Sequence, residues 1–240
     1  LSSDALRALT AAQVAALSTE QLAGLSTTAL THISTSAVAQ LSTAQIASLT
    51  TQQASNLSST SVQALSALQL AAMETADLAV LSSTNLAALS SAQLKGLTTT
   101  QVSSLSTTAL SQLSTGSLSG LTSAQMVSLT TAQVFDLTTT LVKALTASQF
   151  KGLTSAAVAG LTTAQAPVLT TDQLAVMTTA QVSSMVTRDV AALTTAQISK
   201  LTEAQVAAMT TAQVKAIETT DLVKMTDAQL QVITTAAVGV

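Results

Sequence analysis

The sequence contains no cysteine, no tryptophan and no tyrosine, and its only phenylalanines are Phe135 and Phe150. The absence of cysteine excludes disulfide bonds and thiol chemistry. An ordinary globular enzyme of this length would use aromatic side chains to fill its core. The core of this chain must therefore be a thin, repeated seam of leucine, valine, alanine and methionine.

Charge is also scarce, because only 8% of the residues are charged and the formal net charge is −3. There is no basic run interleaved with aromatic residues, which argues against nucleic-acid binding. Serine, threonine and glutamine recur too often to leave about 18 uninterrupted apolar residues, so no transmembrane helix is expected. No signal peptide is visible in the sequence either.

What the sequence does contain is one eight-residue phrase, which recurs without insertion or deletion. Its 240 residues divide into thirty octads of eight, and the clearest copy is Leu193–Lys200. Position 1 of the octad is Leu, Ile or Met, position 5 is most often Gln, and position 6 is apolar. Position 2 is Ser or Thr except at Glu74, Val186 and Glu218. A fixed short period predicts a repeat architecture, so we expect residues 1–240 to form a single continuous array, excerpted from a longer one.

Each octad carries two helix-start signals in one register. The spacing of Thr194 and Gln197 resembles a capping box, in which the hydroxyl and the later side chain each satisfy a backbone amide. Positions 1 and 6 are both apolar and would pack together as a hydrophobic staple. The pattern predicts a helix that begins near position 3 and ends before the next cap. Thr194→Ala should then cost about 1 kcal/mol, whereas Thr195→Ala should be near neutral.

Continuous alternatives fit the period less well. On one long helix, eight residues advance by about 800°, so the apolar stripe would rotate away from any single partner. A heptad coiled coil needs a spacing near 3.5 residues. A β-solenoid remains the alternative because Thr and Val favour strands, although positions 1 and 6 would then point to opposite faces. We predict an all-α solenoid of very short helices, one per octad, each started by a Ser/Thr cap.

Helices this short depend on their neighbours. Isolated helices under about 12 residues are marginal in water, and ordering one octad costs on the order of 12 kcal/mol. Burying one Leu and one Val contributes roughly 3–6 kcal/mol. The remaining stabilisation must come from contacts with stacked neighbouring octads. The sequence does not fix the number of octads per coil. Two per coil would give a rod of roughly 120–150 Å and three a rod of roughly 80–100 Å, with packed helices about 8–10 Å apart.

Several octads depart from the pattern. The pairs Glu74–Asp77 and Glu218–Asp221 each place two carboxylates in a first helical turn, where we expect them to complement the positive helix N-terminus. Val186 removes a cap, and Asp189 is expected to support the neighbouring backbone in its place. Pro167 lacks a backbone donor inside a short helix, so a local kink is expected there.

No chemical site emerges from these departures. His32 is the only histidine, and without a second histidine or a cysteine it does not predict a metal site. No base is arranged beside the abundant hydroxyls, and there is no Gly-rich phosphate loop. We therefore expect no catalytic, cofactor-binding or metal-binding residues, and no enzymatic activity.

Two runs carry a resemblance to a known kind of repeat. Leu161–Gln165 and Met209–Ala216 resemble the Leu-Thr-Thr-Ala-Gln-Val-type repeats of very large bacterial surface or secreted proteins. The resemblance extends over the whole chain. It implies a bacterial, exported protein, located extracellularly or at the cell surface, in which such arrays act as stalks or scaffolds.

The leading functional hypothesis is therefore an extended spacer, stalk or filament-building segment that contacts neighbouring repeats or associates with itself. The alternative is a binding module that presents Thr and Ser rows to a carbohydrate or ice surface. A flat, exposed Thr grid would favour the alternative, whereas hydroxyls engaged as helix caps would favour the scaffold. End-to-end stacking of octads would give fibres, because such contacts do not close.

Overall fold

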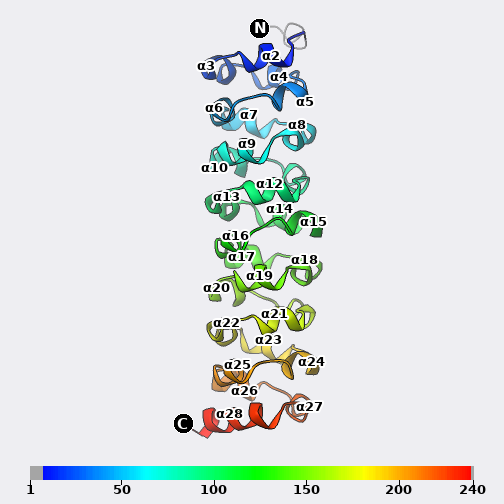
Figure 1. Cartoon of the computed structure of the whole chain (residues 1–240), viewed down its shortest axis with the longest axis vertical. Helices are drawn as coiled ribbons and strands as arrows, with labels where there is room; N and C mark the ends of the chain where they lie inside the picture. Colours follow the sequence, from blue (N-terminus) through cyan, green and yellow to red (C-terminus); the bar gives the residue numbers. More distant parts are fainter. Residues whose placement is uncertain (1–7, 239–240) are drawn as a thin grey trace. The chain divides into compact units, whose positions relative to one another are not determined.

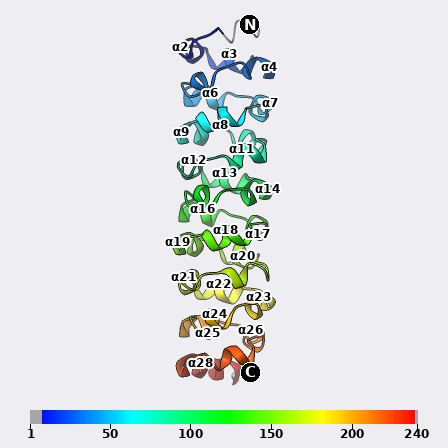
Figure 2. The same cartoon turned by 90° about the vertical axis from the view of Figure 1, so that its right-hand side faces the viewer.

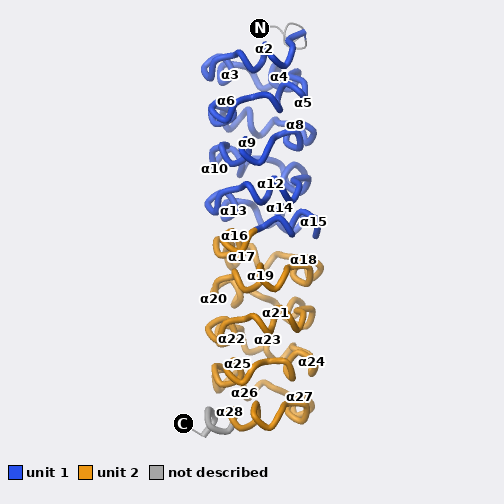
Figure 3. Tube along the Cα trace, viewed as in Figure 1, with its two compact units in different colours: residues 1–121 blue, residues 122–240 orange. Residues whose placement is uncertain are grey.

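The computed structural model describes the backbone of residues 8–238 and the side chains of residues 8–233, so the cap expected at Ser2 lies outside the described residues. The chain forms two compact units, residues 1–121 and 122–240 (Figure 3). The described residues of both are helical and contain no strand. The prediction of an all-α array of very short helices is confirmed, and the β-solenoid alternative is wrong.

The first unit has one short helix per octad from the second octad onward. These helices are α2 (Ala11–Ala15), α3 (Thr19–Ala23), α4 (Thr27–Leu30), α5 (Thr35–Val38), α6 (Thr43–Ala47), α7 (Thr51–Ser55), α8 (Ser59–Ala64), α9 (Ala67–Ala72), α10 (Thr75–Ala79), α11 (Ser83–Ala87), α12 (Ser91–Gly96), α13 (Thr99–Ser104), α14 (Thr107–Ser111) and α15 (Thr115–Leu118).

The second unit continues the octads in the same phase. Its helices are α16 (Ser123–Val127), α17 (Thr131–Phe135), α18 (Thr139–Ala144), α19 (Ala147–Lys151), α20 (Ser155–Val158), the 3₁₀-helix η1 (Ala166–Val168), α21 (Thr171–Ala175), α22 (Thr179–Ser184), α23 (Thr187–Ala191), α24 (Thr195–Ile198), α25 (Glu203–Ala207), α26 (Thr211–Lys215), α27 (Thr219–Leu222) and α28 (Asp227–Val238).

The helices end because two consecutive residues, at positions 1 and 2, adopt extended conformations. Leu65 at position 1 has φ −67° and ψ 135°, and its amide donates to the Val62 carbonyl at 3.3 Å. Ser66 at position 2 then has φ −69° and ψ 162° and caps α9. No described residue has a positive φ. The chain therefore turns without the left-handed glycine that ends many helices.

Two octads of the second unit differ from this scheme. The octad of Pro167, where a local kink is expected, forms a 3₁₀-helix in place of an α-helix. Proline has no amide hydrogen, so it cannot donate the backbone hydrogen bond of a regular α-helix. Helix α28 runs past residue 234, where the repeat places the next cap, without a break.

Within each unit, helices pack against the helix three octads later, so three octads of eight residues form one coil of 24 (Figures 1 and 2). This arrangement settles the coil size that the sequence left open. In the first unit it gives the columns α2–α5–α8–α11–α14, α3–α6–α9–α12–α15 and α4–α7–α10–α13. In the second unit, contacts of the same kind give α16–α19–α21–α24–α27, α17–α20–α22–α25–α28, α18–η1 and α23–α26–α28.

The core of each unit is a seam of position-1 and position-6 side chains. Leu94 at position 6 is 0% exposed and Leu97 at position 1 is 4% exposed. The two phenylalanines differ, because Phe150 occupies position 6 and is fully buried, whereas Phe135 occupies position 7 and is 53% exposed. The seam is thin because each octad contributes only these two large apolar side chains.

Small residues at position 8 let adjacent coils approach closely. A Cβ added to Gly120 would lie 2.0 Å from the Ser91 carbonyl oxygen. A Cβ on Gly96 would lie 2.6 Å from the Cβ of Ala67. In both cases position 8 of one coil lies on position 3 of the coil before it. Glycine is needed at these positions to leave room for the neighbouring coil. It is not needed for an unusual backbone dihedral angle.

Candidate functional site: the position-5 ladder

The predicted capping box is present in the octad that shows the repeat most clearly. The Thr194 amide donates to Gln197 Oε1 at 2.6 Å, and the Gln197 amide donates to Thr194 Oγ1 at 3.3 Å. Every described octad with Gln at position 5 makes this reciprocal pair. In each of these octads, two backbone amides at the helix N-terminus are therefore satisfied by side chains.

Position 5 is also where the buried polar side chains lie. Among the described residues, every polar or charged side chain that is buried occupies this position. We call this set the position-5 ladder. Its members are Gln45, Gln53, Ser61, Gln69, Asp77, Asn85, Gln93, Gln101, Gln125, Gln133, Gln149, Gln165, Gln173, Gln181, Asp189, Gln197, Gln205, Gln213, Asp221 and Gln229.

The glutamines of the ladder also reach into the preceding coil. Gln173 Nε2 donates to the Val142 carbonyl at 2.9 Å and to the Leu145 carbonyl at 2.7 Å. Gln101 makes the same pair of bonds to Leu70 and Met73, both at 2.9 Å. The acceptors are carbonyls at the C-terminal end of a helix, and two of them also accept a backbone amide, Val142 from Leu145 at 3.3 Å and Leu70 from Met73 at 3.2 Å. One glutamine thus caps the start of its own helix and the end of a helix in the coil before it.

The sequence predicted the first of these roles and missed the second. The overlooked signal is the residue type, because a capping box accepts Glu or Gln, yet no octad has Glu at position 5. A glutamate would supply the acceptor for the box but has no hydrogen to donate at neutral pH. The frequent use of glutamine and the absence of glutamate are explained if the position-5 side chain also donates a hydrogen bond.

Three octads have aspartate in the ladder, and they are the three that lack Ser or Thr at position 2. None of them has a side-chain cap. Asp77 and Asp189 are each 1% exposed, and none of their carboxyl oxygens has a hydrogen-bond partner. Asp221 is 6% exposed and accepts a hydrogen bond from Thr195 Oγ1 at 2.6 Å. All three lie in a first helical turn as expected, but their burial was not predicted.

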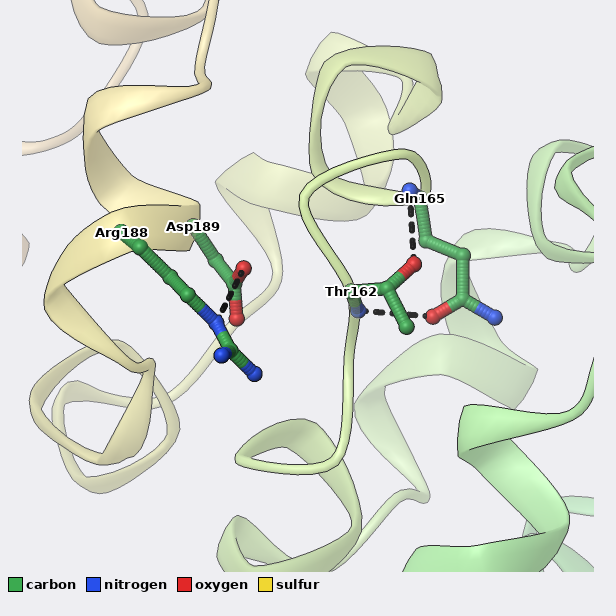
Figure 4. A network of polar contacts seen from close by, with 4 residues as sticks. All are labelled: Thr162, Gln165, Arg188 and Asp189. Carbon is green, nitrogen blue, oxygen red and sulfur yellow. Dashed lines mark hydrogen bonds and ion pairs between the residues drawn. The ribbon is translucent and has the colours of Figure 1, made fainter.

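The expectation that Asp189 supports the neighbouring backbone is wrong. Its charged neighbour is Arg188, whose Nε lies 3.7 Å from Asp189 Oδ1 and whose side chain is 66% exposed (Figure 4). Burial raises the pKa of Asp189, and the Arg188 guanidinium partly offsets that rise. Figure 4 also shows Gln165, at position 5 one coil earlier, in its capping box with Thr162.

Elsewhere the described part of the chain shows little that could support chemistry. His32 is half-buried. No group of three or more His, Cys, Asp or Glu side chains in the described residues could hold a metal ion. No helix of the described residues is both long enough and apolar enough to cross a membrane.

A model of the ALTTAQ repeat family matches the chain at residues 1–27, 70–107 and 182–216. Over these regions the chain is similar to the ALTTAQ repeat. The segment Ala192–Gln197 spells the six residues of that name, and it runs from the end of one octad through the capping box of the next. No curated protein matches the chain. The match supports the repeat region that the octads define.

Proposed function

We propose that this ALTTAQ-type array is a non-catalytic structural segment, an extended spacer, stalk or filament-building part of a bacterial surface or secreted protein. The observation that carries the proposal is that the repeated polar groups are engaged within the array. Each position-2 hydroxyl from Thr10 to Thr226 accepts a hydrogen bond from the amide three residues later. The surface location rests on the resemblance to repeats of bacterial surface proteins.

The mechanism of such a segment is mechanical. Within each unit the coils repeat the same kinds of contact, so adding octads lengthens the array without new kinds of contact. The position-5 ladder fixes the coil spacing, because the amide of Gln173 must meet both its own cap and two carbonyls of the preceding coil. Length is then set by the number of octads.

Scattering separates this role from that of a compact domain. Ten coils spaced about 8–10 Å apart would span roughly 80–100 Å, and a rod of that length has a radius of gyration of roughly 23–29 Å. A compact globule of the same chain length would have a radius of gyration near 18 Å. A small-angle X-ray scattering value near 18 Å, on a monomeric sample, would reject the spacer.

A second candidate function is binding of a carbohydrate or ice surface through hydroxyl rows. Position 3 is threonine throughout the column α4–α7–α10–α13, at Thr27, Thr51, Thr75 and Thr99. Other position-3 hydroxyls are engaged within the array, because Thr131 Oγ1 donates to the Ala156 carbonyl at 3.1 Å. Replacing Thr51, Thr75 and Thr99 with alanine together would abolish ice or glycan binding if this column is the binding surface.

Contact with further repeats is the third part of the proposal. In the first described coil Gln13 and Gln21 are exposed, whereas the glutamines of the later ladder are buried. These two side chains border a hollow of about 600 Å³ with Leu9, Leu17 and Leu25. We propose that another coil of the same repeat covers this face. Light scattering measured as a function of protein concentration tests self-association. Gln13→Glu should reduce self-association.

A further inference from the structure

Two carboxyls of the position-5 ladder are buried without any hydrogen-bond partner. Asp77 and Asp189 are each 1% exposed, and all four of their carboxyl oxygens are unsatisfied. Buried polar side chains in folded proteins almost always have a partner. An ionised carboxylate in such a place is costly unless it is paired.

The ladder shows what a position-5 side chain faces. In the column of Asp189, one coil earlier, Gln165 Nε2 donates to the Val134 carbonyl at 3.0 Å and to the Leu137 carbonyl at 2.6 Å. These acceptors lie 31 and 28 residues before the glutamine. The carbonyl 28 residues before Asp189 belongs to Leu161. An ionised aspartate has no hydrogen to donate to it.

The same relation holds for the aspartate of the first unit. The carbonyl 28 residues before Asp77 belongs to Leu49. In the next octad, Asn85 shows that a side chain of aspartate length can span this gap, because its Nδ2 donates to the Leu57 carbonyl at 2.8 Å. A protonated aspartate has the size and shape of asparagine and carries one O–H donor. The 2.8 Å between Asn85 Nδ2 and the Leu57 carbonyl oxygen is also an ordinary length for an O–H···O hydrogen bond.

The charges around the two aspartates do not provide a buried partner. The helices packed against α10 are α7 and α13, and neither contains a charged residue; the nearest acid in the sequence is Glu74, the N-cap. Around Asp189, α26 contributes Lys215, whose side chain is exposed, while η1 one coil earlier has no charged residue. Arg188 is the one ion-pair partner of Asp189 among the described residues, at 3.7 Å and mostly in solvent.

We propose that Asp189 is a proton-binding position of the array. In the folded chain its carboxyl takes a proton from solvent and donates it to the Leu161 carbonyl, 28 residues earlier. The proton replaces the amide hydrogen that glutamine or asparagine supplies elsewhere in the ladder. Asp77 is buried without a partner in the same way, whereas the carboxylate of Asp221 accepts a hydrogen bond from the Thr195 hydroxyl.

The direction of the pH effect follows from the raised pKa of Asp189. Because the folded state holds this proton more tightly than the unfolded chain, the stabilisation is fully present below the ordinary aspartate pKa of about 3.9. It is lost as pH rises through the folded-state pKa. Each unit between the two pKa values changes the folding equilibrium constant about tenfold. The coil contact at Asp189 is therefore more stable in acid.

Urea unfolding monitored by circular dichroism, from about pH 4 to neutral pH, tests the proposal. Asparagine supplies a permanent donor, so the variant Asp189→Asn should unfold at higher urea than wild type near neutral pH. The difference should close on acidification. The matched control is Asp172→Asn, which removes the same charge from an exposed position in the first turn of α21. It should not stabilise the protein at neutral pH, because a carboxylate there complements the helix N-terminus.

Comparing variants at each pH cancels the titration of other groups. Glu20, for example, has its pKa lowered by a backbone hydrogen bond and by the Ser18 hydroxyl, and it titrates identically in every variant. An Asp189→Asn variant no more stable than wild type at neutral pH, or a difference that does not change with pH, would overturn the proposal. Carbon-13 NMR of the aspartate carboxyls provides a second measurement on the unaltered chain. The Asp189 carboxyl should titrate at a higher pH than an ordinary aspartate, and titration at the ordinary aspartate pKa would also overturn the proposal.

Discussion

Gln213 Nε2 donates to the Met185 carbonyl at 2.7 Å, across 28 residues of sequence, while its Oε1 accepts from the Thr210 amide at 2.8 Å. One side chain therefore joins the end of one helix to the start of another in the next coil. This relation recurs through both units and distinguishes the ladder from an ordinary series of capping boxes.

The ladder predicts that Gln213→Glu is more damaging than Gln213→Ala at neutral pH. Glutamate keeps the capping acceptor but places a negative charge against the Val182 and Met185 carbonyls, whose donors are lost. An uncompensated buried charge costs roughly 3–5 kcal/mol, whereas losing the amide alone costs about 1–3 kcal/mol. Urea unfolding gives both values, and the order of the two variants should converge or reverse in acid. If glutamate is the milder change at neutral pH, the donor role is refuted.

Close approach of the coils predicts opposite effects for two glycines of one octad, at positions 4 and 8. Gly120→Ala should destabilise by about 1–3 kcal/mol, because its Cβ would lie 2.0 Å from the Ser91 carbonyl oxygen. Gly116→Ala is the control, since its nearest neighbour is Ser114 Oγ at 3.7 Å. It lies inside α15 and should stabilise by about 0.5–1 kcal/mol. Thermal unfolding distinguishes them, and equal effects would contradict the close packing.

The structure changes the expected effect of one of the two cap substitutions. Thr194→Ala should still cost about 1 kcal/mol. Thr195→Ala, near neutral by sequence, should also destabilise, because Thr195 Oγ1 donates to the buried Asp221 at 2.6 Å. The cleaner pair is Thr210→Ala against Thr211→Ala, because Thr210 Oγ1 accepts from the N3 amide and Thr211 is exposed at position 3. Equal unfolding midpoints for this second pair would show that the octad register is wrong.

Coil periodicity predicts that deletions act by phase. Removing residues 193–216 takes out three whole octads, so the remaining chain should keep its helical circular dichroism per residue and its cooperative unfolding. Removing residues 193–212 leaves the octads out of phase by four residues. In the intact chain the residue 28 positions before Gln229 is Leu201, whose carbonyl accepts from the Gln229 side chain. In this variant it would be Gln181, at position 5 of its octad. Loss of cooperativity in the second variant only is the expected result, and equal stability of both would argue against the ladder.

The local structure could be predicted from the sequence because its determinants lie three to five residues apart. The hydroxyl at position 2, the amide at position 5 and the staple of positions 1 and 6 all act within one octad. Together they fix where each helix starts and require a break at the next cap. Pro167 shows the same locality, because the missing amide hydrogen changes the helix type in its own octad. The family resemblance likewise came from the octad itself.

Only the tertiary structure determined which octads pack against each other. All octads offer nearly the same surface, so periodicity cannot distinguish a partner two octads away from one three octads away. That choice depends on the angle through which the extended residues at positions 1 and 2 turn the chain, and small angles accumulate over a coil. Only once three octads close a coil does the Gln173 amide meet the Val142 and Leu145 carbonyls. The same closure buries Asp77 and Asp189 where the sequence suggested only a first helical turn.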